Sequence, residues 1–148
     1  MTRDVLVPID GSPLSYQALR YALREFPDAS VTVLHVVDVF DPAPSASADV
    51  APTYEPLIGS EEWYEQAREL SAQLFEEAEA IADEHDRELA TISEIGDPDR
   101  VIVDFADEED VDHVVLGAHG QAAKESPVFG RTAETVARRA TVPVTLIK

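Results

Sequence analysis

The chain has 148 residues and no cysteine, and its 30 acidic residues against 11 Lys and Arg give a formal net charge of -19. This charge opposes binding to nucleic acid or anionic lipid, and the missing thiols exclude disulfides and thiol catalysis. The apolar fraction of 45% is ordinary, so the acid belongs on the surface of a folded domain and does not indicate disorder.

Lysine is rare in the chain, with Lys124 and Lys148 as its two examples. Acidic residues occur on nearly every expected surface, a composition typical of proteins from salt-accumulating halophiles, in which molar salt screens self-repulsion within a few ångströms. A mildly acidic mesophilic protein is the alternative. The scarcity of lysine favours the halophile.

The first residues run directly into an expected strand. Met1 to Asp4 show no basic stretch, apolar run or small-residue cleavage site of a signal peptide, and no apolar run reaches membrane-spanning length. We therefore expect one cytoplasmic domain over residues 1–148, with no membrane and no nucleic-acid partner.

The first expected unit is a buried strand over 5–9, which ends at the turn sequence Asp10-Gly11-Ser12-Pro13. Ser12 is a good N-cap and Pro13 suits the first helical position. Apolar residues then recur at helical spacing as far as Pro27, which predicts an amphipathic helix over one face of a sheet.

The second unit begins with a strand over 31–37, followed by a stretch over 41–59 that is rich in Pro, Ala and Ser. We expect an exposed loop there, either a functional flap or partner surface or simply a disordered segment. Ser60 then caps a helix whose apolar stripe continues to Ile81, while its other side is densely acidic.

The remaining elements keep the alternation of strand and helix. They are a strand over 89–95, a helix from Asp97-Pro98, a strand over 111–116, a helix over 132–140 and a closing strand over 144–147. This order predicts a doubly wound, Rossmann-like α/β domain with a mainly parallel five-stranded sheet, strand order 3-2-1-4-5 and helices on both faces. The loops after Ile9 and Leu116 should then face one another where the strand order reverses, which is where such sheets bind ligands.

The second of these loops has three spaced glycines, at Gly117, Gly120 and Gly130. Glycine lets a ligand approach the backbone closely, and the free amides at the start of the following helix favour a phosphate group. Such glycines alone are weak evidence because Gly also closes ordinary turns. Their position after the fourth strand strengthens the interpretation.

Several segments resemble the universal stress protein family. They are Val-Pro-Ile-Asp-Gly-Ser at 7–12, Leu-His-Val-Val at 34–37, the Gly-x2-Gly-x9-Gly pattern, and the final helix and strand at 132–144. The resemblance covers essentially the whole chain and implies a site for ATP or another adenine nucleotide, with or without Mg²⁺. By this resemblance the adenosine side comprises Pro8, Asp10 and Val36, and the phosphate side comprises Leu116, Gly117, His119, Gly120, Gly130 and Thr132.

One position departs from the family pattern, which usually has Ser or Thr directly after the third glycine, where this chain has Arg131. Arg131 can bind a phosphate bidentately or turn outward to pair with surface acid, and Lys124 has the same two interpretations. We favour the phosphate role for Arg131, although Thr132 can supply the missing hydroxyl.

Three candidate residues also have plain structural explanations. Asp10 also suits a turn or helix cap, His119 an ordinary loop, and His35 a core or edge position satisfied by backbone. We prefer a binding role for Asp10 because it follows a central strand at the expected crevice. The four histidines lack the close spacing of metal ligands, so no metal site is expected.

The resemblance implies nucleotide-responsive regulation as the function. No nucleophile elbow, P-loop or cysteine is present, so binding is preferred to turnover, although slow ATP hydrolysis stays open. A receiver-like phosphorylation switch fits poorly, because the third strand ends Glu94-Ile95-Gly96 with no Asp, and Lys148 is terminal.

A homodimer is expected through the closing strand over 144–147, which is apolar and β-branched and would otherwise present an unpaired edge. In members of the family this strand commonly pairs across a two-fold axis. The alternative is an edge protected by its shortness, by Pro143 and by Lys148. A universal stress protein that binds no nucleotide and acts through dimerisation alone is the other function kept open.

Overall fold

The computed structural model describes residues 3–38, 58–119 and 130–148. The strands and helices alternate along these residues. In chain order they are β1 (Asp4–Ile9), α1 (Pro13–Glu25), β2 (Ser30–Asp38), α2 (Glu61–Glu84), β3 (Leu89–Gly96), α3 (Pro98–Glu108), β4 (His113–Gly117), α4 (Arg131–Arg139) and β5 (Val144–Ile147).

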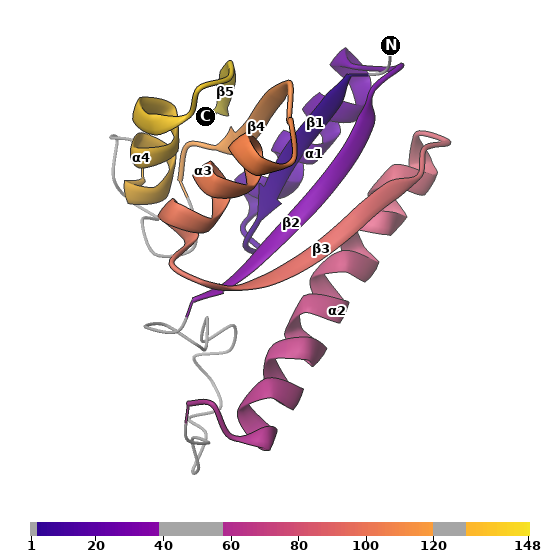
Figure 1. Ribbon diagram of the computed structural model, residues 1–148. Helices are drawn as coiled ribbons and strands as arrows, with labels where there is room; N and C mark the ends of the chain where they lie inside the picture. The colour runs from indigo at the N-terminus through magenta and orange to yellow at the C-terminus, as the bar shows by residue number, and fades with distance from the viewer. Residues whose placement is uncertain (1–2, 39–57, 120–129) are drawn as a thin grey trace.

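The five strands form one sheet in the order β3-β2-β1-β4-β5, and every neighbouring pair is parallel (Figure 1). Val5 in β1 lies opposite Val31 of β2 on one side and His113 of β4 on the other. The predicted strand order and Rossmann-like class are therefore confirmed. The strand order reverses between β1 and β4, which places the expected crevice there.

Helices cover both faces of the sheet. In β1, Val5, Val7 and Ile9 pack with α1 and α2, whereas Leu6 between them packs with α3 and α4. This alternation follows from the period of two in a strand, and it explains why the central strands are continuously apolar.

The predicted helix starts are confirmed at their caps. Ser12 and Ser60 each accept a hydrogen bond at Oγ from an amide three residues later, and Asp97 accepts one from Asp99 N. Pro13 and Pro98 occupy the first helical positions, where the missing N–H costs nothing.

Several boundaries differ from the prediction by one or two residues. β4 begins at His113, not at residue 111, because Val111 N donates to Ala106 O and Asp110 adopts a φ of 51°, so both residues still belong to the turn that ends α3. α4 begins at Arg131, one residue earlier than expected. Of the expected loop over 41–59, residues 41–57 lie outside the described part, and Ile58 and Gly59 form a turn before α2.

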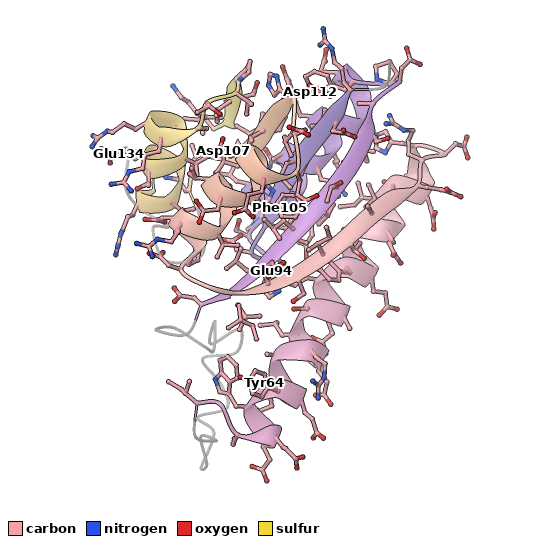
Figure 2. The ribbon with its side chains drawn as sticks, in the orientation of Figure 1. Tyr64, Glu94, Phe105, Asp107, Asp112 and Glu134 are labelled. Carbon is pink, nitrogen blue, oxygen red and sulfur yellow. The ribbon has the colours of Figure 1, made fainter. Side chains whose placement is uncertain are left out.

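Most acidic side chains of the described residues are exposed. Glu94, Asp107 and Glu134, which Figure 2 labels, are exposed, and so is the whole run from Asp107 to Asp110. Solvated helix termini explain this run, as expected. Among the helices described, none combines the length and apolar character needed to cross a lipid bilayer.

Candidate functional site

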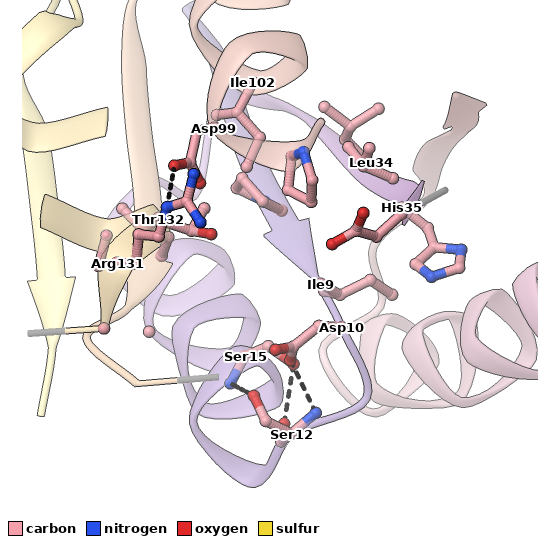
Figure 3. A pocket seen from close by; sticks show the side chains of 18 of the residues that line it. Ile9, Asp10, Ser12, Ser15, Leu34, His35, Asp99, Ile102, Arg131 and Thr132 are labelled. Atoms are coloured by element: carbon pink, nitrogen blue, oxygen red, sulfur yellow. Dashed lines mark hydrogen bonds and ion pairs between the residues drawn. The ribbon is translucent and has the colours of Figure 1, made fainter. Parts of the chain in front are cut away.

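A pocket of about 360 Å³ lies where β1, β2 and β4 end and where α3 and α4 begin (Figure 3). This is the crevice between β1 and β4 that the topology predicts. The structure brings to it every described residue of the predicted site: Pro8, Asp10, Val36, Leu116, Gly117, His119, Gly130, Arg131 and Thr132. Gly120 lies outside the described residues.

Asp10 occupies the end of β1 and also organises the turn into α1. Its Oδ1 accepts a hydrogen bond from Ser12 N at 2.9 Å, and Ser12 in turn caps α1 through Ser15 N. The plain structural explanation of Asp10 is therefore present in the molecule. The carboxylate is half-buried and lines the pocket, so the turn also fixes it at the pocket wall.

His35 lies in a chain of side-chain hydrogen bonds beside the pocket. Its Nδ1 is 2.7 Å from Ser71 Oγ, which is 3.0 Å from Ser93 Oγ. A backbone partner was expected for this ring, and a serine on α2 takes that place because α2 packs directly over β2. Burial lowers the pKa of His35, and the nearby Asp10 carboxylate opposes this in part.

The phosphate side of the predicted site is built where β4 ends and α4 begins. Gly117 packs against Leu14 of α1, and Gly130 N donates to Ala118 O, which ties the start of α4 to the end of β4. Gly130 is the N-cap of α4 and supplies no side-chain cap, so the first amides of the helix are left for other partners. His119 Nδ1 is buried there and meets no hydrogen-bond partner among the described residues.

Arg131 forms an ion pair with Asp99, a lining residue of α3 that sequence reasoning missed. Arg131 Nε lies 3.3 Å from Asp99 Oδ2, and Thr135 Oγ1 donates to the same oxygen at 3.3 Å. The Asp99 side chain is 12% exposed and the Arg131 side chain 86%, so the cation covers a buried carboxylate from outside. The signal for Asp99 was its place two residues after the cap Asp97, but the sequence does not show that α4 would lie beside it.

The described lining is acidic. It contains Asp10, Asp38, Asp97 and Asp99, and Arg131 is the one Lys or Arg among the described lining residues. Within that described part, no three His, Asp or Glu side chains converge as a metal-ion site would require. The chemistry of this pocket is that of a binding site with apolar walls, a helix N-terminus and one paired cation.

A parallel α/β sheet with helices on both faces and a crevice at its switch point is the architecture of Rossmann-like ligand-binding domains. The family model described as the universal stress protein family matches residues 1–148, so the chain belongs to that family. The structure of residues 3–38, 58–119 and 130–148 agrees with this assignment.

Individual relatives are similar over nearly the whole chain. Universal stress protein MJ0531 of Methanocaldococcus jannaschii is 30% identical over 149 residues, which is 99% of this chain and 82% of the relative. Universal stress protein UspA from Lactobacillus plantarum has the same fold, with a TM-score of 0.77, 24% identity and coverage of 99% and 97% of the two chains.

Two further solved structures contain nucleotides. A universal stress protein in complex with cAMP has a TM-score of 0.66 and 20% identity, covering 99% of this chain and 97% of the other. A family protein from Arabidopsis thaliana with AMP bound has a TM-score of 0.67 and 17% identity, covering 99% and 91%. At these identities the likeness shows the fold.

Proposed function

We propose that this protein is an adenine-nucleotide-binding regulator that acts as a homodimer in the cytoplasm of a salt-accumulating cell. The observation that carries the proposal is the convergence of two loops, after β1 and after β4, on one pocket at the switch point. These loops lie more than 100 residues apart in the chain, so the pocket is a product of the fold.

The adenosine side is assigned to the ends of β1 and β2. Pro8 and Val36 offer apolar surface to a planar base, and Asp10 offers a carboxylate that can accept hydrogen bonds from sugar hydroxyls. The hydrogen bond from Ser12 N already holds the Asp10 carboxylate in place, so its side chain loses little conformational freedom when a ligand binds.

The phosphate side is assigned to the start of α4. Its uncapped amides and helix dipole favour an anion, and Gly130 lets the anion approach the backbone. His119 lines the pocket and its buried Nδ1 has no partner among the described residues, so a ligand group can satisfy it. The cAMP and AMP complexes of fold neighbours support an adenine nucleotide as the ligand class.

Dimerisation is assigned to the outer edge of β5. Pro143 O accepts a hydrogen bond from Val114 N of β4, and Ile147 O accepts one from Ala118 N directly after β4. By the alternation of a strand, the backbone groups of Val144 and Leu146 therefore face away from the sheet. An edge of this kind can pair with a second copy. The exposed acid and the rarity of lysine support operation at high salt.

The test is calorimetric titration of the purified protein with ATP and AMP in molar KCl. Binding of either nucleotide by the intact protein is expected, and Gly130→Val should abolish it because a branched side chain blocks approach to the α4 amides. Ala137→Val is the matched control, since Ala137 is exposed on the same helix and lies outside the pocket lining. No binding by the intact protein would overturn the proposal.

A further inference from the structure

The phosphate end of the pocket contains an ion pair whose two charges cancel. Asp99 is almost fully buried and Arg131 lies over it, with Nε 3.3 Å from Oδ2 (Figure 3). The carboxylate is held in place from three directions, because it stands in the first turn of α3, accepts a hydrogen bond from Thr135 of α4 and contacts Arg131.

The pairing decides how much positive charge a ligand would meet. Arg131 is the one Lys or Arg in the described lining, and Asp10, Asp38 and Asp97 add further carboxylates around the same pocket. With Arg131 neutralised by Asp99, the described side chains leave the phosphate end without net positive charge. Each additional phosphate of a ligand then adds repulsion, which among the described residues the α4 amides offset.

From this arrangement we infer that the Asp99–Arg131 pair sets the specificity of the site by ligand charge. The pocket takes adenosine compounds of low charge, such as a nucleoside or a monophosphate, in preference to a triphosphate without a divalent cation. Asp99 is the specificity-determining residue, and it acts by cancelling Arg131. This inference rests on the proposed function, because it concerns the ligand class of the same pocket.

The substitution Asp99→Asn tests the charge alone. Asparagine keeps a carbonyl oxygen for Thr135 and Arg131, so the local packing and hydrogen bonds survive while one negative charge disappears. Asp104→Asn is the matched control. Asp104 is exposed on α3 outside the pocket lining, and its substitution removes the same charge from the molecule.

The experiment measures affinities for adenosine, AMP and ATP in EDTA by calorimetry, at the lowest KCl concentration at which circular dichroism shows a folded protein. The intact protein should bind AMP more tightly than ATP, and adding Mg²⁺ should reduce the difference between the two affinities. Asp99→Asn should leave the affinity for adenosine unchanged, raise the affinity for AMP about threefold and raise the affinity for ATP about tenfold, because the gain in affinity grows with ligand charge. Arg131→Gln should lower the affinities for AMP and ATP, and Asp104→Asn should have the same three affinities as the intact protein.

Two results would overturn the inference while leaving the proposed function standing. One is weaker ATP binding by Asp99→Asn, which would mean that Asp99 orients Arg131 toward the phosphates. The other is an unchanged ratio of ATP to adenosine affinity in that variant. Failure of all three ligands to bind the intact protein would remove the proposed function and this inference together.

Discussion

Gly117 at the end of β4 lies directly against Leu14 of α1. A Cβ added at Gly117 would stand 2.9 Å from the Leu14 Cβ and 3.2 Å from Ser15 N, and these atoms belong to or adjoin the backbone of α1 and cannot rotate away. The close packing of the end of β4 against α1 therefore depends on the absence of a side chain at residue 117.

Gly117→Ala should lower the free energy of unfolding by about 1–3 kcal/mol, because the new methyl group forces β4 and α1 apart. Urea unfolding in molar KCl measures this. Gly59→Ala is the comparison, since a Cβ at Gly59 meets no atom of the described residues within 4 Å, and the expected cost comes from the φ of 87°. Gly59→Ala should leave nucleotide affinity unchanged. A fully stable Gly117→Ala protein would show that the close packing of β4 and α1 is unimportant.

Arg87 joins three parts of the chain outside the pocket. Its Nη1 donates to Leu23 O at 3.0 Å and its Nη2 to Ala29 O at 2.6 Å, so the turn after α2 is tied to the end of α1 and to the start of β2. Arg87→Lys should cost about 1–3 kcal/mol of stability, because an ammonium lacks the planar fork that reaches both carbonyls. Arg20→Lys, at an exposed position of α1, should change stability little in the same urea titration.

His35 should make the fold less stable in acid. Burial lowers its pKa in the folded protein below the ordinary value of 6.5, so the unfolded chain binds the proton more readily. The contribution of His35 to the free energy of unfolding is therefore fully present above about pH 6.5, and it is lost as the pH falls toward the pKa of the folded state. His35→Gln should reduce the difference between the free energies of unfolding at about pH 7.5 and about pH 5.5.

The control for His35 is Ser71→Ala, which removes the hydroxyl at 2.7 Å from Nδ1 but keeps a titrating ring in the same buried place. Ser71→Ala should therefore retain the pH dependence even if it is less stable overall. Equal pH dependence in His35→Gln and the intact protein would assign the acid sensitivity to other groups. His113 is a second contributor of the same sign, because burial, together with Arg3, also lowers its pKa.

The proposed dimer can be tested at Leu146, whose backbone N–H faces the outer edge of β5 by the alternation described above. Leu146→Pro should give a monomer in sedimentation experiments at high salt, because proline removes that donor. Leu146→Ala keeps the N–H while losing a similar amount of side-chain packing, and it should stay dimeric. A monomeric intact protein would rule the dimer out.

Local patterns were sufficient to predict the elements of this fold. The segment 5–9 predicts a buried strand without any information from the rest of the chain. A cap residue followed by proline, as in Ser12-Pro13 and Asp97-Pro98, is enough to predict the start of a helix. The alternation of these elements then restricts the topology, so the order β3-β2-β1-β4-β5 could be predicted before any contact was known.

The contacts of charged side chains could not be predicted in the same way. Arg131 was expected near a phosphate or paired with surface acid, and it pairs with Asp99, which lies inside the pocket and 32 positions earlier in the chain. That partner depends on the angle at which α3 packs beside α4, which no short segment encodes. The same holds for His35, whose partner Ser71 comes from a helix on another part of the chain.

The position of β1 also has a consequence for how the chain is made. β1 is the central strand, yet its neighbour β4 pairs with it from His113 onward, and Asp4 N bonds to Asp112 across 108 positions. A ribosome adding about 5–20 residues per second needs on the order of 5–20 s to produce this separation. During that interval β1, α1 and β2 have emerged while one edge of Val5 to Ile9 has no strand beside it. Delays in translation between β2 and β4 should therefore raise the yield of aggregated nascent chains.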